Sequence, residues 1–106
     1  MDFADCFMEI KEDFVPLALY KIQSLIGDLW NKWQIVRGNL EKEFEFKDFN
    51  SALLFVNKVG ILAENEKHYP SIVLGYGKVK ISIFTYSVNA LTVADFILAE
   101  RINEIF

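Results

Sequence analysis

With 106 residues and a single cysteine, the chain is long enough for one domain with its own core, and an internal disulfide is excluded. Its 53% hydrophobic content excludes an intrinsically disordered protein, and no apolar stretch approaches the roughly 20 residues of a membrane-spanning helix. The net charge of −4 comes from residues 1–13, which hold five acids and one base. The rest of the chain has no basic excess, which argues against direct binding to nucleic acid. We expect a cytoplasmic protein without a signal peptide or membrane contact.

The first predicted element is an amphipathic, acidic helix over residues 1–14. Its apolar residues recur at helical spacing, and they are Phe3, Phe7, Ile10 and Phe14. Pro16 suits the first turn of a second helix, which should end near Gly27. The apolar face of this second helix carries Leu19, Ile22, Ile26 and Leu29. We interpret residues 1–14 as an extension of a domain that occupies residues 15–106.

Two strand-like runs follow, at residues 33–37 and 40–46. Gly38-Asn39 joins them, and two such residues between alternating runs are typical of a β-hairpin. In the second run, three acids alternate with apolar residues, and they are Glu41, Glu43 and Glu45. One face of the sheet should therefore contact water, which is the simpler interpretation, or a partner.

A long helix is predicted after Asp48, which is a plausible N-cap. It carries a broad apolar face, made of Phe49, Ala52, Leu53, Phe55, Val56, Val59, Gly60, Leu62 and Ala63. Residues 72–76 and 79–86 then predict a second hairpin that turns through Gly77-Lys78. The segment from Thr92 to Asp95 has the pattern of a capping box and should open a last helix that runs to the C-terminus.

The predicted order is α-β-β-α-β-β-α, preceded by the extra helix at the N-terminus. Hairpins that alternate with helices favour an α+β fold, in which helices pack on one face of a four-stranded antiparallel sheet. No pattern of metal ligands or phosphate-binding glycines is present, since the chain has one histidine and one cysteine, far apart.

The single histidine stands in the string His68-Tyr69-Pro70. Three residues separate Glu64 from His68, five separate Pro70 from Tyr76, nine separate Tyr76 from Tyr86, and eight separate Tyr86 from Asp95. This spacing, the segment 44–52 and the position of Trp33 resemble the pterin-4a-carbinolamine dehydratases, also known as dimerization cofactors of a homeodomain transcription factor. The resemblance covers about residues 16–106. The family carries histidines where this chain has Tyr69 and Tyr86, and a glycine where it has Ala90.

The resemblance implies that the chain dehydrates a 4a-hydroxytetrahydropterin to a quinonoid dihydropterin by general acid/base catalysis. The reduced pterin would be the substrate, with no cofactor and no metal. The catalytic residues implied are His68, Tyr69 and Tyr86. The substrate-binding residues implied are Glu64, Pro70, Thr85, Ser87 and Asp95. Because a phenol is a poor base at neutral pH, we expect reduced activity.

Several of these residues also have an ordinary structural interpretation. Asp95 closes a capping box, Glu64 is a charged residue near a helix end, and Tyr76 would pack beside the hairpin. The tyrosines at positions 69 and 86 and the extra acidic N-terminal helix motivate an alternative function, a non-catalytic interaction or assembly module on the same fold. Pterin binding without turnover lies between the two. The resemblance further implies a homodimer or homotetramer and leaves room for another protein partner.

Overall fold

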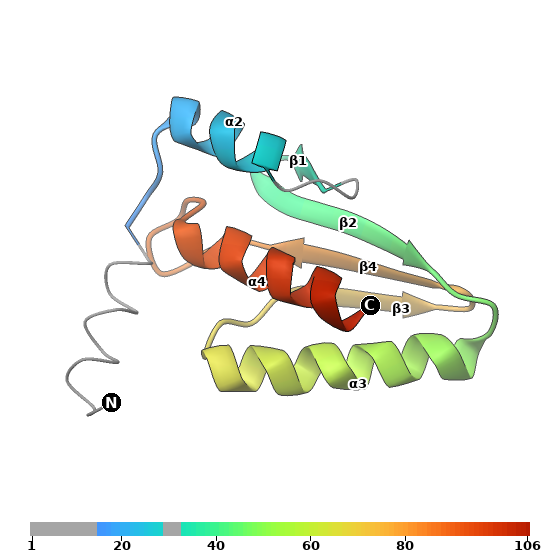
Figure 1. Ribbon diagram of the computed structural model, residues 1–106. Helices are drawn as coiled ribbons and strands as arrows, with labels where there is room; N and C mark the ends of the chain where they lie inside the picture. The colour runs from blue at the N-terminus through green and yellow to red at the C-terminus, as the bar shows by residue number, and fades with distance from the viewer. Residues whose placement is uncertain (1–14, 29–32) are drawn as a thin grey trace.

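The computed structural model describes residues 15–28 and 33–106, which contain three helices and four strands (Figure 1). In chain order these are α2 (Leu19–Asp28), β1 (Gln34–Val36), β2 (Asn39–Glu45), α3 (Phe49–Glu66), β3 (Ser71–Gly75), β4 (Lys78–Ile83) and α4 (Val93–Ile105). The predicted order α-β-β-α-β-β-α is confirmed, and the helix predicted over residues 1–14 lies outside the described residues. Within the described part of the chain, no helix is both long and apolar enough to cross a membrane.

The strands form one antiparallel sheet in the order β1-β2-β4-β3, and helices α3 and α4 pack against one of its faces (Figure 1). Alternate residues of the two central strands point toward these helices and are fully buried, namely Leu40, Phe44, Val79, Ile81 and Ile83. The opposite face is open and carries the glutamates. There Glu43 lies opposite Lys80 and Glu45 opposite Lys78, so two of the three glutamates face a base on the neighbouring strand. The predicted α+β fold is confirmed.

Aromatic rings fill the space between the sheet and the helices. The ring of Phe44 lies 4.8 Å from that of Phe55 on α3 and 4.9 Å from that of Phe106 at the end of α4. Trp33 meets Phe44 edge-on at 6.0 Å and donates a hydrogen bond from Nε1 to Oδ1 of Asn103 at 2.8 Å. Tilted and edge-to-face pairs of this kind add to the stabilisation that burial of the rings provides. The aromatic cluster therefore ties the start of β1, the middle of α3 and the end of α4 to β2.

Both hairpins are present, but each turns one residue earlier than predicted. The first turn is Arg37-Gly38 rather than Gly38-Asn39, and the second is Tyr76-Gly77. Arg37 and Gly38 both have positive φ, at 53° and 84°, as a two-residue turn of type I′ requires. The sequence pattern missed this register because arginine is an unusual residue at a left-handed position.

Two other boundaries also differ from the prediction. Strand β4 ends at Ile83 instead of reaching Tyr86, because the chain turns away to form an isolated bridge between Thr85 and Ala90. Helix α2 begins at Leu19, three residues after Pro16. Its contacts with the core come from Ile22, Leu25 and Ile26, whereas Leu19 is exposed.

Only half of the broad apolar face predicted for α3 is buried. The buried stripe consists of Ala52, Phe55, Val59 and Ala63. Large apolar side chains also project from the other side of the helix, which we call the outer face of α3 (Phe49, Leu53, Leu54 and Ile61). Several exposed apolar side chains on one helix are a feature of surfaces that contact another protein.

Asp48 caps α3 as predicted. Its carboxylate accepts a hydrogen bond from the backbone N–H of Ser51 at 2.7 Å, which satisfies a donor that the first turn of a helix leaves unpaired. This hydrogen bond lowers the pKa of Asp48 below its ordinary value, because it favours the charged form.

Replacing Asp48 with alanine is expected to lower the melting temperature at pH 7 by a few degrees. Because folding lowers the pKa of Asp48, the contribution of the cap is complete above about pH 4, the usual value for an unfolded aspartate, and is lost as the pH falls through the folded value. Thermal unfolding of wild type and variant at pH 7 and at pH 3, followed by circular dichroism, measures this. Asp48→Asn keeps a capping oxygen and should lose less at pH 7. A melting difference between wild type and alanine variant that did not shrink at pH 3 would contradict the assignment.

Candidate functional site

The C-terminal end of α3 fixes the position of His68. Lys67 adopts the left-handed conformation, with φ 55° and ψ 38°. Its backbone N–H donates to the carbonyl of Glu64 at 3.3 Å, and the N–H of His68 donates to the carbonyl of Ala63 at 3.2 Å. These two hydrogen bonds are those of a Schellman motif, formed here with lysine where glycine is usual. The backbone of His68 is thus held by the helix that precedes it.

The imidazole of His68 meets the carboxylate of Asp95 beneath the surface. The distance between Nε2 of His68 and Oδ1 of Asp95 is 2.5 Å. Asp95 is completely buried, and His68 keeps 7% of its surface exposed. A carboxylate accepts hydrogen bonds, so Nε2 carries the proton in this contact. A buried charged group must be paired in this way, because its transfer from water is otherwise strongly unfavourable.

The other carboxylate oxygen of Asp95 accepts two further hydrogen bonds. Oδ2 lies 2.9 Å from Oγ1 of Thr85 and 2.8 Å from the backbone nitrogen of Thr92. The second of these belongs to the capping box at the start of α4, which is present as predicted. The hydroxyls of Thr85 and Thr92 are themselves 2.8 Å apart. We call His68, Thr85, Thr92 and Asp95 the Asp95 network.

The structure thus brings together three of the residues that the sequence indicated, namely His68, Thr85 and Asp95. Sequence reasoning treated Thr92 only as a cap and did not include it in the site. The strand register could have shown that these residues meet. Ser71 pairs with Ser82, and the same register continued for three more residues places His68 opposite Thr85. The capping box then brings Asp95, and with it Thr92, to the same point.

The remaining candidates lie at the surface around this network. Tyr69 is 55% exposed and Tyr86 is 68% exposed, and each directly follows a member of the network in the chain. The ring of Tyr86 packs edge-on against Phe84 at 5.0 Å. Exposed Ser87 lies in the turn after Tyr86, and half-buried Pro70 follows Tyr69.

Exposed Glu64, on the last turn of α3, is paired with a base. Its carboxylate lies 3.2 Å from the ammonium of Lys67. The hydrogen bond from Lys67 has the largest effect on the pKa of Glu64, and a hydrogen bond from the hydroxyl of Tyr69 adds to it. Together they hold this pKa below its ordinary value. The same pairing raises the pKa of Lys67. This corner of the surface therefore carries one fixed negative and one fixed positive charge at neutral pH.

Tyr76 belongs to the spacing pattern but not to the site. It is 77% exposed and lies in the β3–β4 turn, at the far end of β3 from His68. Five residues of β3 separate this turn from the start of the strand, a length of about 17 Å. The expectation that Tyr76 packs beside the hairpin is wrong, because its side chain projects into solvent.

The loop between β4 and α4 explains why Ala90 is tolerated where the family has glycine. Thr85 and Ala90 exchange two backbone hydrogen bonds of 3.3 Å each, which close the loop. The left-handed residue of this loop is Asn89, with φ 52°, and asparagine adopts that conformation more readily than most residues. Position 90 therefore does not need the conformational freedom of glycine.

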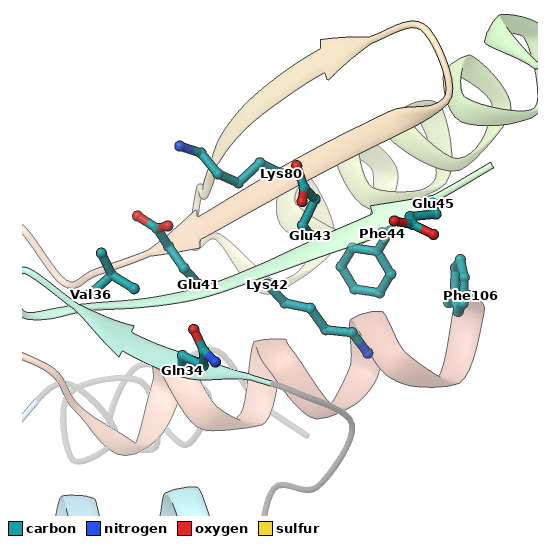
Figure 2. A pocket seen from close by; sticks show the side chains of 9 residues that line it. All are labelled: Gln34, Val36, Glu41, Lys42, Glu43, Phe44, Glu45, Lys80 and Phe106. Carbon is teal, nitrogen blue, oxygen red and sulfur yellow. The ribbon is translucent and has the colours of Figure 1, made fainter.

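A shallow pocket of about 650 Å³ lies elsewhere, at the edge of the sheet (Figure 2). It is lined by Gln34, Val36, Glu41, Lys42, Glu43, Phe44, Glu45, Lys80 and Phe106. It exists because β1 spans three residues and β2 spans seven, so the second half of β2 extends past its neighbour. Since none of its residues belongs to the Asp95 network, we assign the candidate site to the network, where a buried carboxylate and a histidine meet, and not to this pocket.

Comparison with known proteins gives similar sequences from one family. The sequence profile of the family described as Pterin 4 alpha carbinolamine dehydratase matches residues 15–105. A relative from Alkaliphilus metalliredigens (strain QYMF) that bears the name pterin-4-alpha-carbinolamine dehydratase is 39% identical over 90 residues, which are 84% of this chain and 81% of the relative.

Two solved structures are similar. A transcriptional coactivator/pterin dehydratase from Brucella melitensis aligns with a TM-score of 0.80 and 28% identity, over 86% of this chain and 98% of its own. A pterin dehydratase-like protein identified as a RuBisCO assembly factor in the alpha-carboxysome has the same fold, with a TM-score of 0.61 and 20% identity. The alignment covers 73% of this chain and 92% of that protein's chain. The match of the family profile to nearly the whole domain, on a fold that carries the expected histidine and aspartate, shows that this chain belongs to the pterin-4a-carbinolamine dehydratase family.

Proposed function

We propose that the protein dehydrates a 4a-hydroxytetrahydropterin to a quinonoid dihydropterin in the cytoplasm, with the reduced pterin as its substrate and no cofactor. The observation that carries this proposal is the contact of 2.5 Å between His68 and buried Asp95 in a member of this family. An exposed histidine would need no such partner. A histidine that a buried carboxylate orients is the usual arrangement for proton transfer.

The reaction requires two proton movements. The bond between carbon 4a and its hydroxyl oxygen breaks, that oxygen takes up a proton and leaves as water, and the neighbouring ring nitrogen gives up its proton. Imidazole suits such transfers, because its ordinary pKa of about 6.5 lies close to neutral pH. We assign one of the two transfers to His68.

The two tyrosines are assigned supporting roles. Tyr86 would donate a proton or hydrogen bond to the departing hydroxyl, and Tyr69 would hydrogen-bond to the pterin or stack on it. Their exposure beside the network supports these roles, as does the packing of Tyr86 on Phe84, which limits its motion. Since a phenol is a weak base at neutral pH, we expect slower turnover than a site with three histidines would give.

Glu64, Pro70 and Ser87 would form the rim that contacts the substrate. Glu64 is held as a carboxylate by Lys67 and Tyr69, which supports a role as a hydrogen-bond acceptor for the ring N–H and amino groups of a pterin. Asp95 lies beneath this rim and would act through His68.

The direct test generates a 4a-hydroxytetrahydropterin in situ and follows its dehydration with and without purified protein. Acceleration above the spontaneous rate that scales with protein concentration is expected. A rate equal to the spontaneous one at every protein concentration would contradict the enzymatic proposal. Calorimetric titration with a dihydropterin would then separate pterin binding without turnover from a complete absence of binding.

A second candidate is a non-catalytic interaction or assembly module, and the outer face of α3 favours it. The four apolar side chains of this face remain 37–65% exposed within the described chain. A homodimer or homotetramer that buries them would be consistent with either function, and we propose such an oligomer.

Light scattering should therefore give a mass above that of one chain, and Leu54→Glu should reduce it because a charge cannot be buried in an apolar contact without a partner. Val73→Glu, which changes an exposed apolar residue on the open face of the sheet, is the matched control and should leave the mass unchanged. A monomeric wild type would refute the oligomer. An intact oligomer that does not accelerate dehydration would favour the interaction module.

A further inference from the structure

We propose that Thr85 and Thr92 are positioning residues, whose paired hydroxyls lock the Asp95 carboxylate so that it holds His68 in one orientation with the proton on Nε2. The importance of this role for catalysis rests on the proposed function of His68. The hydrogen bonds that hold the carboxylate are independent of that function.

The groups that hold His68 lie in the interior of the protein. Thr85 is 2% exposed, and Thr92 and Asp95 are completely buried. Two hydroxyls and a carboxylate in the interior are unfavourable unless every one is hydrogen-bonded. Among the described residues, no buried side-chain oxygen or nitrogen lacks a partner. The network therefore satisfies itself, and Thr85 does not have a spare hydroxyl proton to offer a substrate.

The number of hydroxyl protons determines which group donates in each hydrogen bond of the network. A hydroxyl has one proton, and Thr85 donates its own to Oδ2 of Asp95 at 2.9 Å. The contact of 2.8 Å between the two threonine hydroxyls must then use the proton of Thr92. Hydrogen bonds thus run from Thr92 to Thr85 to Asp95, and from His68 to Asp95 on the other side. Bonds aligned in such a chain strengthen one another.

The topology explains why these two hydroxyls control the carboxylate. Thr85 lies just after β4 and is held by its bridge to Ala90, while Thr92 is the N-cap of α4. Oδ2 of Asp95 is thereby bound to both elements at once. A carboxylate with one oxygen held twice cannot rotate, so Oδ1 stays directed at Nε2 of His68.

The presence of a single histidine makes this testable without a substrate. In protein labelled with ¹⁵N-histidine, the N–H signal of His68 is the only one of its kind. For wild type we expect one resolved Nε2–H that exchanges slowly with water. In Thr85→Val, which keeps the shape and removes the hydroxyl, we expect exchange about tenfold faster, because an accepted hydrogen bond to a charged group is lost. Thr85→Ser should restore the wild-type signal.

Ser87→Ala is the matched control, because it removes an exposed hydroxyl two residues away and should leave the Nε2–H exchange unchanged. In the dehydration assay, Thr85→Val should lower kcat and leave KM nearly unchanged, since the buried hydroxyl of Thr85 donates its proton to Asp95 and not, as the resemblance implied, to the pterin. An Nε2–H signal in Thr85→Val identical to wild type in position and exchange rate would overturn the proposal.

Should Thr85→Val fail to fold, Thr92→Val decides the question. It leaves the direct bond from Thr85 to Asp95 and the backbone bond from residue 92 in place, and removes the hydroxyl that donates to Thr85 and takes part in the capping box. Faster Nε2–H exchange, smaller than tenfold but outside error, is expected, and an unchanged rate would overturn the relay. If no dehydration is observed for wild type, the proposed function fails while the exchange data still decide the positioning role.

Discussion

Replacing His68 with alanine is expected to lower the rate of pterin dehydration by about 10²–10⁴-fold, or to the spontaneous rate if the wild-type enzyme is slow. The reason is that His68 is the one side chain in the site whose ordinary pKa lies near neutral pH. Tyr69 and Tyr86 can donate hydrogen bonds but cannot replace it as a base. The measurement is kcat/KM for dehydration of a 4a-hydroxytetrahydropterin, corrected for the uncatalysed reaction.

This variant also removes a hydrogen-bond donor from buried Asp95, so its fold must be checked by circular dichroism before its rate is interpreted. Tyr76→Phe is the matched control, because Tyr76 belongs to the same spacing pattern but lies at the far end of β3, and its activity should equal that of wild type. Tyr69→Phe and Tyr86→Phe should reduce the rate less than His68→Ala. A folded His68→Ala protein that retained the wild-type rate would remove His68 from the mechanism.

Replacing Asp95 with leucine is expected to have the largest effect on stability, a loss of about 3–5 kcal/mol in the free energy of unfolding. The substitution leaves three buried donors without their acceptor: Nε2 of His68, the hydroxyl of Thr85 and the backbone N–H of Thr92. It also removes the carboxylate of the capping box at the start of α4. Urea unfolding followed by circular dichroism measures the loss.

The variant Asp95→Asn distinguishes the effect of Asp95 on stability from its effect on the dehydration rate. Its carbonyl oxygen can still accept from Thr85 and Thr92, while its amide group faces His68 and turns Nε2 from donor to acceptor. We expect a smaller loss of stability than in the leucine variant, together with a loss of dehydration, because the histidine then presents the wrong tautomer. An asparagine variant as unstable as the leucine variant, or one that is fully active, would contradict this account of the network.

Much of the fold follows from local signals in the sequence. The alternation of strand 39–45, the cap at Asp48 and the capping box at Asp95 predict elements that the structure contains. The failures have local causes as well. Periodicity shows which residues of α3 are apolar but not which of its two apolar sides meets the sheet, so Phe49 and Leu53 were expected in the core and are exposed. The turn at Arg37 was missed because its strained backbone conformation depends on the pairing of the strands around it.

Most residues of the candidate site could be predicted from the sequence, but their burial and their hydrogen-bond partners could not. The spacing of residues in the chain and the family resemblance indicate His68, Thr85 and Asp95. They gave no sign that Thr85 is buried and committed to Asp95, or that Thr92 supplies the second hydroxyl. Hydrogen-bond direction and burial arise from the meeting of β4 and α4, which no single stretch of sequence contains.

The Asp95 network also bears on the order in which the fold forms. Its contacts join residues at most 27 apart in the chain, whereas the bond from Trp33 to Asn103 joins residues 70 apart. The entropy of closing a loop grows with the logarithm of its length, so the longer closure is less favourable by about 0.8 kcal/mol. The segment 68–95 can therefore come together as a local folding unit around one carboxylate, and the closure that brings β1 and the end of α4 together follows later.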